Sequence, residues 1–464
     1  MSLKEHYDVI IVGAGPAGIF TALELISKGG LKVAIIEKGK DIEKRTCYIE
    51  KLGNCLNCKV CDMLNGWGGA GAFSDGKLNL SPEIGGFLLD YIPKIELINL
   101  INYVDSIYVK MGAPQKIYAP DVSNIEKIVK ACSRYGLIFI PSKIRHIGTE
   151  KCKEILKNLK DVISKKVDIL FEKPVTKILT SGKKVKGIQL KDGTKILANY
   201  VVIAPGRAGS SWLEAEAKRL KLTTTINPVD IGVRVEVPAS VMEDLTSLCY
   251  EPKILYYSKT FDDPVRTFCV NPYGEVIIEN VDGVWTVNGH SYSHKKTENT
   301  NFAILCSTYF TEPFKEPILY GTNIAKLANL LGKEVIIQRL GDIKKGRRST
   351  EARISKNPVK PSLKVATPGD LSFVLPYRYL VNILEMLEAL DKIVPGINSP
   401  YTLLYGVEVK FYSIRLKLNN SLETEIKNLF IAGDGGGITR GLIQASVSGV
   451  IIAREILKRL PNTR

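Results

Sequence analysis

The feature that most constrains the fold is a glycine-rich turn close to the first residue. Gly13, Gly15 and Gly18 have the G-x-G-x-x-G spacing, and they lie between an apolar strand, residues 9–12, and a helical pattern over residues 19–28. In such a turn the first glycine permits the tight bend, the second lets a pyrophosphate approach the backbone, and the third lets the helix pack closely on the strand. The unpaired N–H groups and the positive dipole of the helix N-terminus also favour phosphate binding.

A second apolar strand follows over residues 33–36, and it ends in Glu37. In dinucleotide-binding units an acid about 20 residues beyond the glycine turn accepts hydrogen bonds from the adenosine ribose. A glycine motif alone is weak, whereas the full order of strand, turn, helix, strand and acid favours a dinucleotide site. The sequence therefore predicts that Glu37 binds the ribose and that the turn binds the pyrophosphate.

Another glycine-rich segment lies near the other end of the chain. Residues 428–433 predict a strand, Asp434 follows, and a glycine-rich turn leads into an apolar helix that runs to about residue 460. In FAD enzymes with such a segment the aspartate binds a ribityl hydroxyl, and the positive helix end stabilises the reduced, anionic flavin. A third segment, residues 200–207, resembles the strand and turn found midway along such chains. Three distant segments therefore predict one FAD site.

Further predicted FAD contacts come from these segments, from the strands beside them, and from the glycine-rich stretch that starts at residue 66. They are Pro16, Ala17, Lys38, Arg45, Gly68, Gly69, Ala70, Val175, Ala204, Gly206, Gly433, Arg440, Gly441 and Leu442.

The order of the segments predicts two interleaved domains, as expected for a chain of 464 residues. Residues 1–221 and 416–464 form an α/β, Rossmann-type FAD-binding domain, with a β-meander over residues 176–197. Residues 222–415 contain no second glycine-rich dinucleotide turn, and they form an inserted α+β substrate domain. NAD(P)H would then bind transiently over the flavin or not at all.

Charge and hydropathy restrict the partners. The chain carries a net charge of +16, and residues 143–200 hold 15 basic and 6 acidic side chains. This excess is either a solvated face or a docking surface for an acidic protein, an anionic membrane or nucleic acid. No apolar run reaches the roughly 18 residues needed for a transmembrane helix, and the first strand leaves no room for a signal peptide. We expect a cytoplasmic protein, and only four Gln beside abundant Ile and Lys hint at a thermophile.

Four cysteines form a cluster just before the glycine-rich stretch: Cys47, Cys55, Cys58 and Cys61. A C-x2-C-x2-C run with a fourth cysteine nearby is typical of iron–sulfur ligation. The same thiolates would suit zinc. The spacing is also compatible with a redox-active disulfide, which could exchange electrons with a flavin, or with a structural disulfide.

Candidate catalytic residues lie in the inserted domain. His290 follows an Asn-Gly turn and has a side chain suited to proton transfer. Arg347, beside Arg348, could bind a carboxylate or phosphate. Lys410 and Glu408 stand in an otherwise apolar strand, where charges need partners or line a polar pocket.

The chain resembles the largely uncharacterised FAD-dependent dehydrogenase family, sometimes labelled NAD(FAD)-utilising dehydrogenases. The motifs that carry the resemblance are residues 55–61, 69–78, 229–236, 266–269, 287–290, 341–349 and 405–410. The resemblance covers nearly the whole chain, and it implies the fold and FAD binding without implying a substrate.

The favoured function is a flavin oxidoreductase that passes a hydride or electrons between FAD and a small, anionic substrate. A four-cysteine centre or an electron-transfer partner protein could take part. A basic, nucleic-acid-directed enzyme of the tRNA-modifying kind is less favoured, and strong salt-dependent RNA binding would distinguish it. A non-enzymatic protein with a decayed cofactor site is disfavoured, because the glycine turn, Glu37 and Asp434 are all intact.

Overall fold

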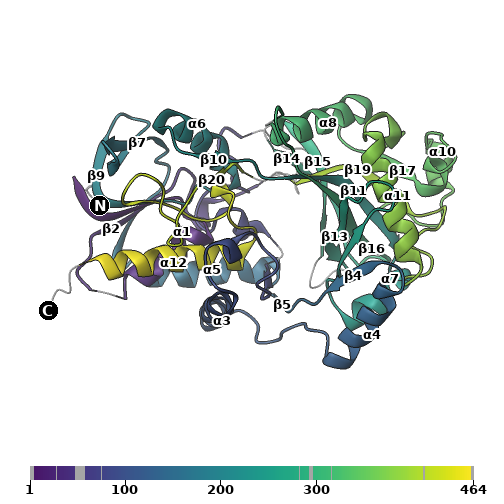
Figure 1. The fold of residues 1–464 in the computed structure, drawn as a ribbon, viewed down its shortest axis with the longest axis horizontal. Coiled ribbons are helices and arrows are strands. Elements are labelled where there is room, and N and C mark those ends of the chain that lie inside the picture. Colours follow the sequence, from purple (N-terminus) through teal and green to yellow (C-terminus); the bar gives the residue numbers. More distant parts are fainter. Residues whose placement is uncertain are drawn as a thin grey trace. The chain divides into compact units, whose positions relative to one another are not determined.

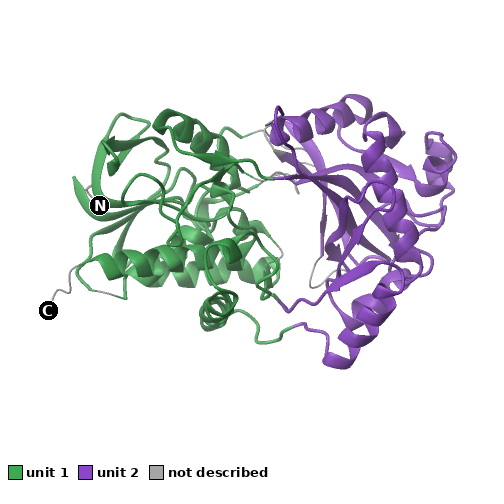
Figure 2. Cartoon of the chain, viewed as in Figure 1, with its two compact units in different colours: residues 1–117, 145–227, 413–464 green, residues 118–144, 228–412 purple. Residues whose placement is uncertain are grey.

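The computed structural model describes residues 5–27, 29–47, 58–74, 76–281, 283–291, 296–314, 316–410 and 413–460. The chain divides into two compact units (Figure 2). Unit 1 comprises residues 1–117, 145–227 and 413–464, and unit 2 comprises residues 118–144 and 228–412. Residues 118–144 differ from the predicted division, because β4 (Leu137–Ile140) within them pairs with β12 (Lys253–Tyr257) of unit 2.

Unit 1 is built on a parallel sheet that continues into an antiparallel meander (Figure 1). Neighbouring strands run β6, β2, β1 and β9, and β9 pairs in parallel with β21 near its end and antiparallel with β8 near its start. The strands are β6 (Val167–Leu170), β2 (Val33–Ile36), β1 (His6–Val12), β9 (Lys195–Ile203), β21 (Leu429–Ile431), β8 (Lys184–Leu190) and β7 (Val175–Ser181). Short strands are β3 (Lys77–Asn79), β5 (Ile144–His146), β10 (Thr224–Thr225) and β20 (Arg415–Leu416).

The two faces of this sheet are buried by different elements. Val9 and Ile11 of β1 join a core with helices α1, α3, α5 and α12, whereas Ile10 and Val12 join a core with the meander and α6. Successive strand residues point to opposite faces, so burial of both faces explains the continuous apolar runs in the sequence. The helices are α1 (Pro16–Leu25), α3 (Lys94–Lys110), α5 (Thr149–Ile163), α6 (Ser210–Leu220) and α12 (Leu442–Arg459).

Unit 2 is an eight-stranded mixed sheet flanked by helices, in the strand order β18-β17-β19-β11-β16-β13-β12-β4. Besides β12 and β4, its strands are β18 (Thr367–Pro368), β17 (Ile336–Arg339), β19 (Leu403–Lys410), β11 (Val229–Pro238), β16 (Asn299–Thr308) and β13 (Pro264–Asn271). A separate hairpin joins β14 (Glu275–Val281) and β15 (Val284–His290). The helices are α4 (Val122–Ser133), α7 (Ala239–Leu248), α8 (Pro317–Gly332), α9 (Leu340–Ile343), α10 (Glu351–Ser355) and α11 (Tyr377–Asp391).

Strand β11 shows how unit 2 separates apolar from polar side chains. Its odd residues, such as Val233 and Val235, enter the main hydrophobic core, together with side chains of α7 and α11. Its even residues include Asp230, Arg234 and Glu236, each 0% exposed. Because side chains alternate along a strand, these three share the other face and create a buried polar layer there.

The predicted fold class, an α/β unit of Rossmann type with a meander and an α+β insertion, is confirmed. Within the part of the chain that the structure describes, no helix is long and apolar enough to cross a membrane.

Candidate functional site

The first glycine turn separates structural from cofactor-facing glycines. A Cβ on Gly13, whose φ is +105°, would lie 2.1 Å from the carbonyl oxygen of Ala204. A Cβ on Gly18 would lie 2.0 Å from the carbonyl oxygen of Gly13. These two glycines are therefore required by packing between the turn, the helix and the neighbouring strand. Gly15 differs, because a Cβ there would meet nothing within 4 Å.

Each of the other two predicted FAD segments also contains a glycine that borders open space. A Cβ on Gly206 or on Gly441 would meet no atom within 4 Å. Gly206 follows β9, and Gly441 immediately precedes α12. Open space beside bare backbone is what a closely bound pyrophosphate or flavin requires. The residues of these segments therefore fit FAD.

Glu37 holds the turn together through three backbone amides. Its Oε2 accepts from the N–H of Ala14 at 2.8 Å, and its Oε1 accepts from Gly39 at 2.8 Å and Gly66 at 2.9 Å. The side chain is 6% exposed. Sequence reasoning assigned Glu37 to the ribose alone and missed this bridge between the turn and the stretch that starts at Gly66. The ribose contact stays a prediction.

Arg45 fixes the same stretch through its carbonyl groups. The guanidinium donates to the carbonyl oxygens of Asp62 at 2.9 Å, Trp67 at 2.5 Å and Gly69 at 2.8 Å. Burial lowers the pKa of Arg45 to about 10, although Glu37 opposes the shift. Arg45 therefore uses its N–H donors to hold the backbone carbonyl groups of the glycine-rich stretch in place.

The glycine-rich stretch lies against the turn and the start of α12. The N–H of Gly68 donates to the carbonyl of Ala14 at 2.8 Å, and a Cβ on Gly69 would lie 3.2 Å from the Cα of Gly15. A Cβ on Gly71 would lie 2.6 Å from a methyl group of Leu442. The structure thus brings the predicted residues of these three segments together.

Asp434 lies in the last of the predicted FAD segments, shortly after the end of β21. It accepts from the hydroxyl of Thr439 at 2.9 Å and the N–H of Gly441 at 3.4 Å. Burial raises its pKa, and the charge of Arg207 opposes that shift. Its oxygens retain capacity for a ligand hydroxyl, because each carboxylate oxygen can accept two hydrogen bonds.

Two residues that sequence reasoning missed also support this segment. Gly86 pairs with Thr439 in an antiparallel bridge, and the carbonyl of Gly85 accepts from the N–H of Arg440 at 2.6 Å. A Cβ on Gly86 would lie 2.5 Å from the Cα of Thr439. The Gly-Gly pair was the signal in the sequence that could have indicated this close approach.

The remaining predicted contacts lie near the rim of the site or further away. Lys38 Nζ donates to the carbonyl of Ala208 at 3.0 Å, next to the turn that contains Gly206. The N–H of Gly433 donates to Ser448 Oγ at 3.0 Å. Val175 begins β7 and pairs with Leu190 in the meander.

The predicted metal site falls partly outside the described residues. Cys55 lies there, whereas Cys47, Cys58 and Cys61 belong to the described residues. In the described ranges no three His, Cys, Asp or Glu side chains are grouped to hold a metal ion. The three described cysteines therefore do not by themselves fit a cluster or zinc ion, and the four-cysteine centre stays a prediction.

The candidate catalytic residues of unit 2 lie in different places. Lys410 belongs to the buried polar layer, where its Nζ lies 3.1 Å from Glu408. Arg347 contacts Asp342 at 2.8 Å, in a separate cluster. His290 ends β15, half-buried, and pairs in register with Glu275.

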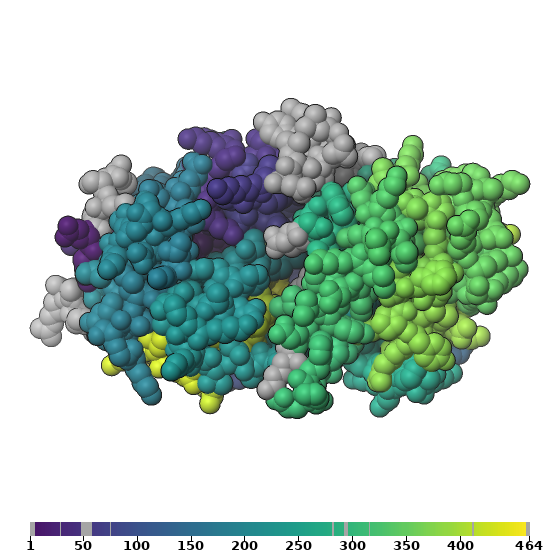
Figure 3. Space-filling view, turned by 90° about the horizontal axis from the view of Figure 1, so that it is seen from above, coloured from purple at the N-terminus to yellow at the C-terminus, as the bar shows by residue number. Residues whose placement is uncertain are grey.

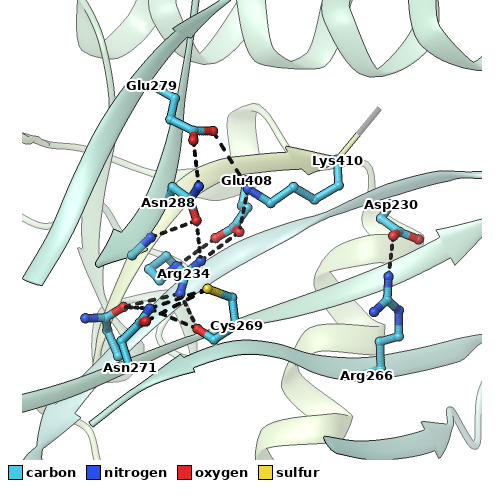
Figure 4. Close-up of polar contacts among 11 residues, drawn as sticks. Asp230, Arg234, Arg266, Cys269, Asn271, Glu279, Asn288, Glu408 and Lys410 are labelled. Atoms are coloured by element: carbon cyan, nitrogen blue, oxygen red, sulfur yellow. Dashed lines mark hydrogen bonds and ion pairs between the residues drawn. The ribbon is translucent and has the colours of Figure 1, made fainter. Parts of the chain in front are cut away.

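Arg234 organises the polar layer (Figure 4). Its Nε and Nη2 donate to the two oxygens of Glu408 at 2.8 and 2.9 Å. The remaining N–H groups donate to the carbonyl of Cys269 at 2.8 Å, to Asn301 at 3.2 Å and to Asn288 at 3.0 Å. All five donors of a guanidinium are thus satisfied, so Arg234 holds its neighbours in place.

Lys410 lies at the edge of the buried polar layer. Its side chain is 9% exposed, and Glu279, whose Oε2 lies 4.0 Å from Lys410 Nζ, is 35% exposed. Glu279 also accepts from Asn288 at 2.7 Å. The hairpin β14–β15 is therefore linked to the sheet by charged side chains (Figure 4).

A β-bulge makes this arrangement possible. The pairing of β11 with β19 shifts between Gly232 and Arg234, so Glu408 lies opposite Gly232 and Tyr405 lies opposite Arg234. An extra residue reverses the alternation of side chains, and Tyr405 and Glu408 therefore share the polar face despite their odd separation. Tyr405 donates to Glu236 at 2.5 Å. Burial raises the pKa of the Glu236 carboxyl.

Comparisons with known proteins agree with this geometry. Residues 8–48 match the family model described as FAD binding domain, and residues 228–411 match the model described as FAD-dependent protein, C-terminal domain-like. By these two matches the chain contains an FAD-binding domain and a domain typical of FAD-dependent proteins. The resemblance to FAD-dependent proteins inferred from the sequence motifs is thereby confirmed.

Individual relatives are distant. An uncharacterised protein of Clostridium beijerinckii is 28% identical over 478 residues, covering 97% of this chain and 80% of the relative. Among solved structures, the glycine oxidase of Bacillus cereus is 15% identical, covers 98% of this chain and 96% of that chain, and has a TM-score of 0.38. The L-proline dehydrogenase of P. horikoshii is 14% identical, with coverages of 99% and 96% and a TM-score of 0.39.

Proposed function

We propose that the protein transfers a hydride or an electron pair between FAD and a small anionic molecule. The observation that carries the proposal is the set of three glycines, Gly15, Gly206 and Gly441, that border open space in three separate segments. Bound FAD would supply the redox chemistry. The chain's own contribution is to bind and orient that cofactor through backbone N–H groups and Asp434.

The first turn of α1 supports phosphate binding. Gly15 is its N-cap residue, and Pro16 occupies the first helical position. Pro16 has no N–H, so the N–H groups of Gly15, Ala17 and Gly18 are the donors available at this helix end. The N–H of Ala14 is already taken by Glu37. An anion bound there would also gain from the helix dipole.

On the substrate side, we propose Lys410 as the anion contact. All five donors of Arg234 are used. Lys410 has three donors, and among the described residues one acceptor, Glu408 at 3.1 Å, lies within hydrogen-bond distance of its Nζ. Lys410→Met should raise KM for an anionic substrate, and Lys410→Arg should restore part of the loss. Arg347 stays a weaker candidate, because it contacts Asp342 in a separate cluster, and His290 stays a candidate at the end of β15.

A matched pair of variants tests the FAD site. Gly13→Ala should destabilise the fold, because its Cβ would lie 2.1 Å from the Ala204 carbonyl oxygen in a backbone with φ of +105°. Gly15→Ala should leave the fold stable, since its Cβ has free space, but it should weaken FAD binding by filling that space. Thermal unfolding of the apoprotein and fluorimetric FAD titration separate the two effects. Unchanged FAD affinity in Gly15→Ala would refute the proposed site.

The cysteines need their own test. We propose that a redox centre involving Cys58 and Cys61 exchanges electrons with FAD, as either an iron–sulfur cluster or a disulfide. The visible spectrum of anaerobically purified protein distinguishes a cluster from a disulfide, because a cluster adds a broad absorbance that dithionite bleaches. Flavin bands alone would eliminate the cluster. A redox titration unchanged by Cys58→Ser would eliminate both.

A further inference from the structure

A buried glutamine lies in the first turn of α12, the helix that follows the last of the predicted FAD segments. Gln444 is 2% exposed, and most of its neighbours on α12 are buried as well. Only small patches of the C-terminal part of the chain, coloured yellow, reach the face seen in Figure 3. A polar side chain buried in this way needs a partner for each of its hydrogen-bonding groups.

The amide nitrogen of Gln444 has its partners within unit 1. Nε2 donates to the carbonyl oxygens of Pro82 at 3.2 Å and Ile84 at 3.0 Å. These two bonds use both N–H donors of the amide. They also decide which way round the amide lies, because an oxygen in the place of Nε2 would face two other oxygens. The carbonyl oxygen, Oε1, therefore lies on the edge of the amide that points away from these two residues.

Oε1 of Gln444 is a buried acceptor with an unused capacity. Among the described residues it has no hydrogen-bond partner. A buried acceptor that stays unmet lowers the stability of the folded protein. A ligand N–H placed beside Oε1 would remove that cost, so this oxygen favours a ligand that can donate.

The side chain of Gln444 lies beside the turn that precedes α12. Side chains on a helix lean toward its N-terminus, and residues three apart share one face. Gln444 therefore lies on the same face as Gly441, where a Cβ would meet no atom within 4 Å. A Cβ on Gly85 would lie 2.8 Å from the carbonyl oxygen of Arg440 and 3.2 Å from Gln444 Cγ. The side chain is thus placed next to the open space at Gly441.

The N-terminus of α12 and Oε1 together match the pyrimidine edge of an oxidised flavin. That edge carries two carbonyl oxygens with a single N–H group, N3–H, between them. The unpaired N–H groups of a helix N-terminus suit the carbonyl oxygens. The N3–H group needs an acceptor, and Gln444 supplies one in the same helical turn.

We propose that Gln444 is a specificity residue of the FAD site, whose Oε1 accepts a hydrogen bond from the N3–H group of the flavin ring. This inference rests on the proposed function and assigns a side chain to the flavin end of the same site. All of the residues that carry it belong to unit 1. Gln444 would make the site selective for a ring that keeps its N–H at this edge.

The test compares FAD with 3-methyl-FAD, in which a methyl group replaces the hydrogen at N3. The dissociation constant of each cofactor for the apoprotein is measured by fluorescence titration. The proteins are the wild type, Gln444→Glu, Gln444→Met and a control in the meander, Gln189→Met. Both Gln444 variants lose the Nε2 donors to Pro82 and Ile84, but only Gln444→Glu keeps an oxygen in the place of Oε1.

We expect the wild type and Gln189→Met to bind FAD at least about tenfold more tightly than 3-methyl-FAD, because the methyl group removes the donor and leaves a buried acceptor unmet. Gln444→Glu should keep this preference. In Gln444→Met the preference should fall below about threefold, because no acceptor remains. A weaker hold on residues 82–84 would affect both cofactors alike, so the ratio of the two dissociation constants reports on Oε1.

A wild-type ratio near one would overturn the proposal, and this measurement does not depend on the folding of any variant. An undiminished preference in Gln444→Met would overturn it too. Equal losses of preference in Gln444→Glu and Gln444→Met would also do so, since they would show that Gln444 acts only by holding residues 82–84. A wild-type protein that binds neither cofactor would refute the proposed function itself, and the inference with it.

Discussion

Glu408→Gln should strongly destabilise unit 2, although it keeps the shape of the side chain. Arg234 and Glu408 both have 0% exposed side chains, and two of the five guanidinium donors point at the carboxylate. The change removes the carboxylate charge that both Arg234 and Lys410 contact, and Lys410 then keeps Glu279 at 4.0 Å. Removing one partner of a buried ion pair costs about 3–5 kcal/mol. For a unit of this size that corresponds to a fall of roughly 6–20 °C in melting temperature.

Calorimetry and hydrogen exchange provide the assay. The loss should be local, with faster exchange in β11 and β19, the two strands that carry the pair. Glu388→Gln is the control in the same unit, because Glu388 is 62% exposed and lies 3.8 Å from Lys344. It should change stability by less than about 1 kcal/mol. The double variant Arg234→Met/Glu408→Gln should recover much of the loss. A loss below about 1 kcal/mol in Glu408→Gln, or no recovery in the double variant, would refute this reasoning.

Three further predictions address contacts elsewhere in the chain. Gly289→Ala should destabilise the protein by about 1–3 kcal/mol, because its Cβ would lie 2.1 Å from Asn301 Oδ1; a neutral result in urea denaturation would contradict the close packing. Glu37→Ala should weaken FAD binding and also loosen the stretch that starts at Gly66. Faster proteolysis of the apoprotein would reveal this loosening. Asp342→Asn should destabilise the protein at pH 7. Burial raises the pKa of Asp342, but its hydrogen bonds outweigh burial and hold the pKa in the folded state below the unfolded value near 3.9. That stabilisation is present above about pH 4 and is lost as the pH falls further, so the gap in melting temperature should close on acidification.

Local pattern predicted much of the fold. The strand, turn, helix and strand over residues 6–36 occur as expected, and α1 begins at Pro16, three residues before the predicted start. The meander over residues 176–197 also occurs. These features follow from side-chain periodicity and turn residues, which act between close neighbours in the sequence.

The candidate site was predicted less completely. The glycines could be located because their spacing is local, but two of the three amides bound by Glu37 and the support from Gly85 and Gly86 depend on distant segments. Equally, apolar periodicity could not assign residues 118–144 to a unit, because that assignment depends on which strand β4 pairs with.

By itself, the sequence determined the α/β class, the glycine turn and the presence of charges in unusually apolar strands. The tertiary structure decided which of those charges meet. Arg234 and Glu408 are separated by 174 positions, and a bulge in β19 decides that Glu408 and Tyr405 face the same side. A shift of one residue in strand register moves every side chain to the opposite face, so long-range pairing, which no local pattern encodes, fixed the buried polar layer.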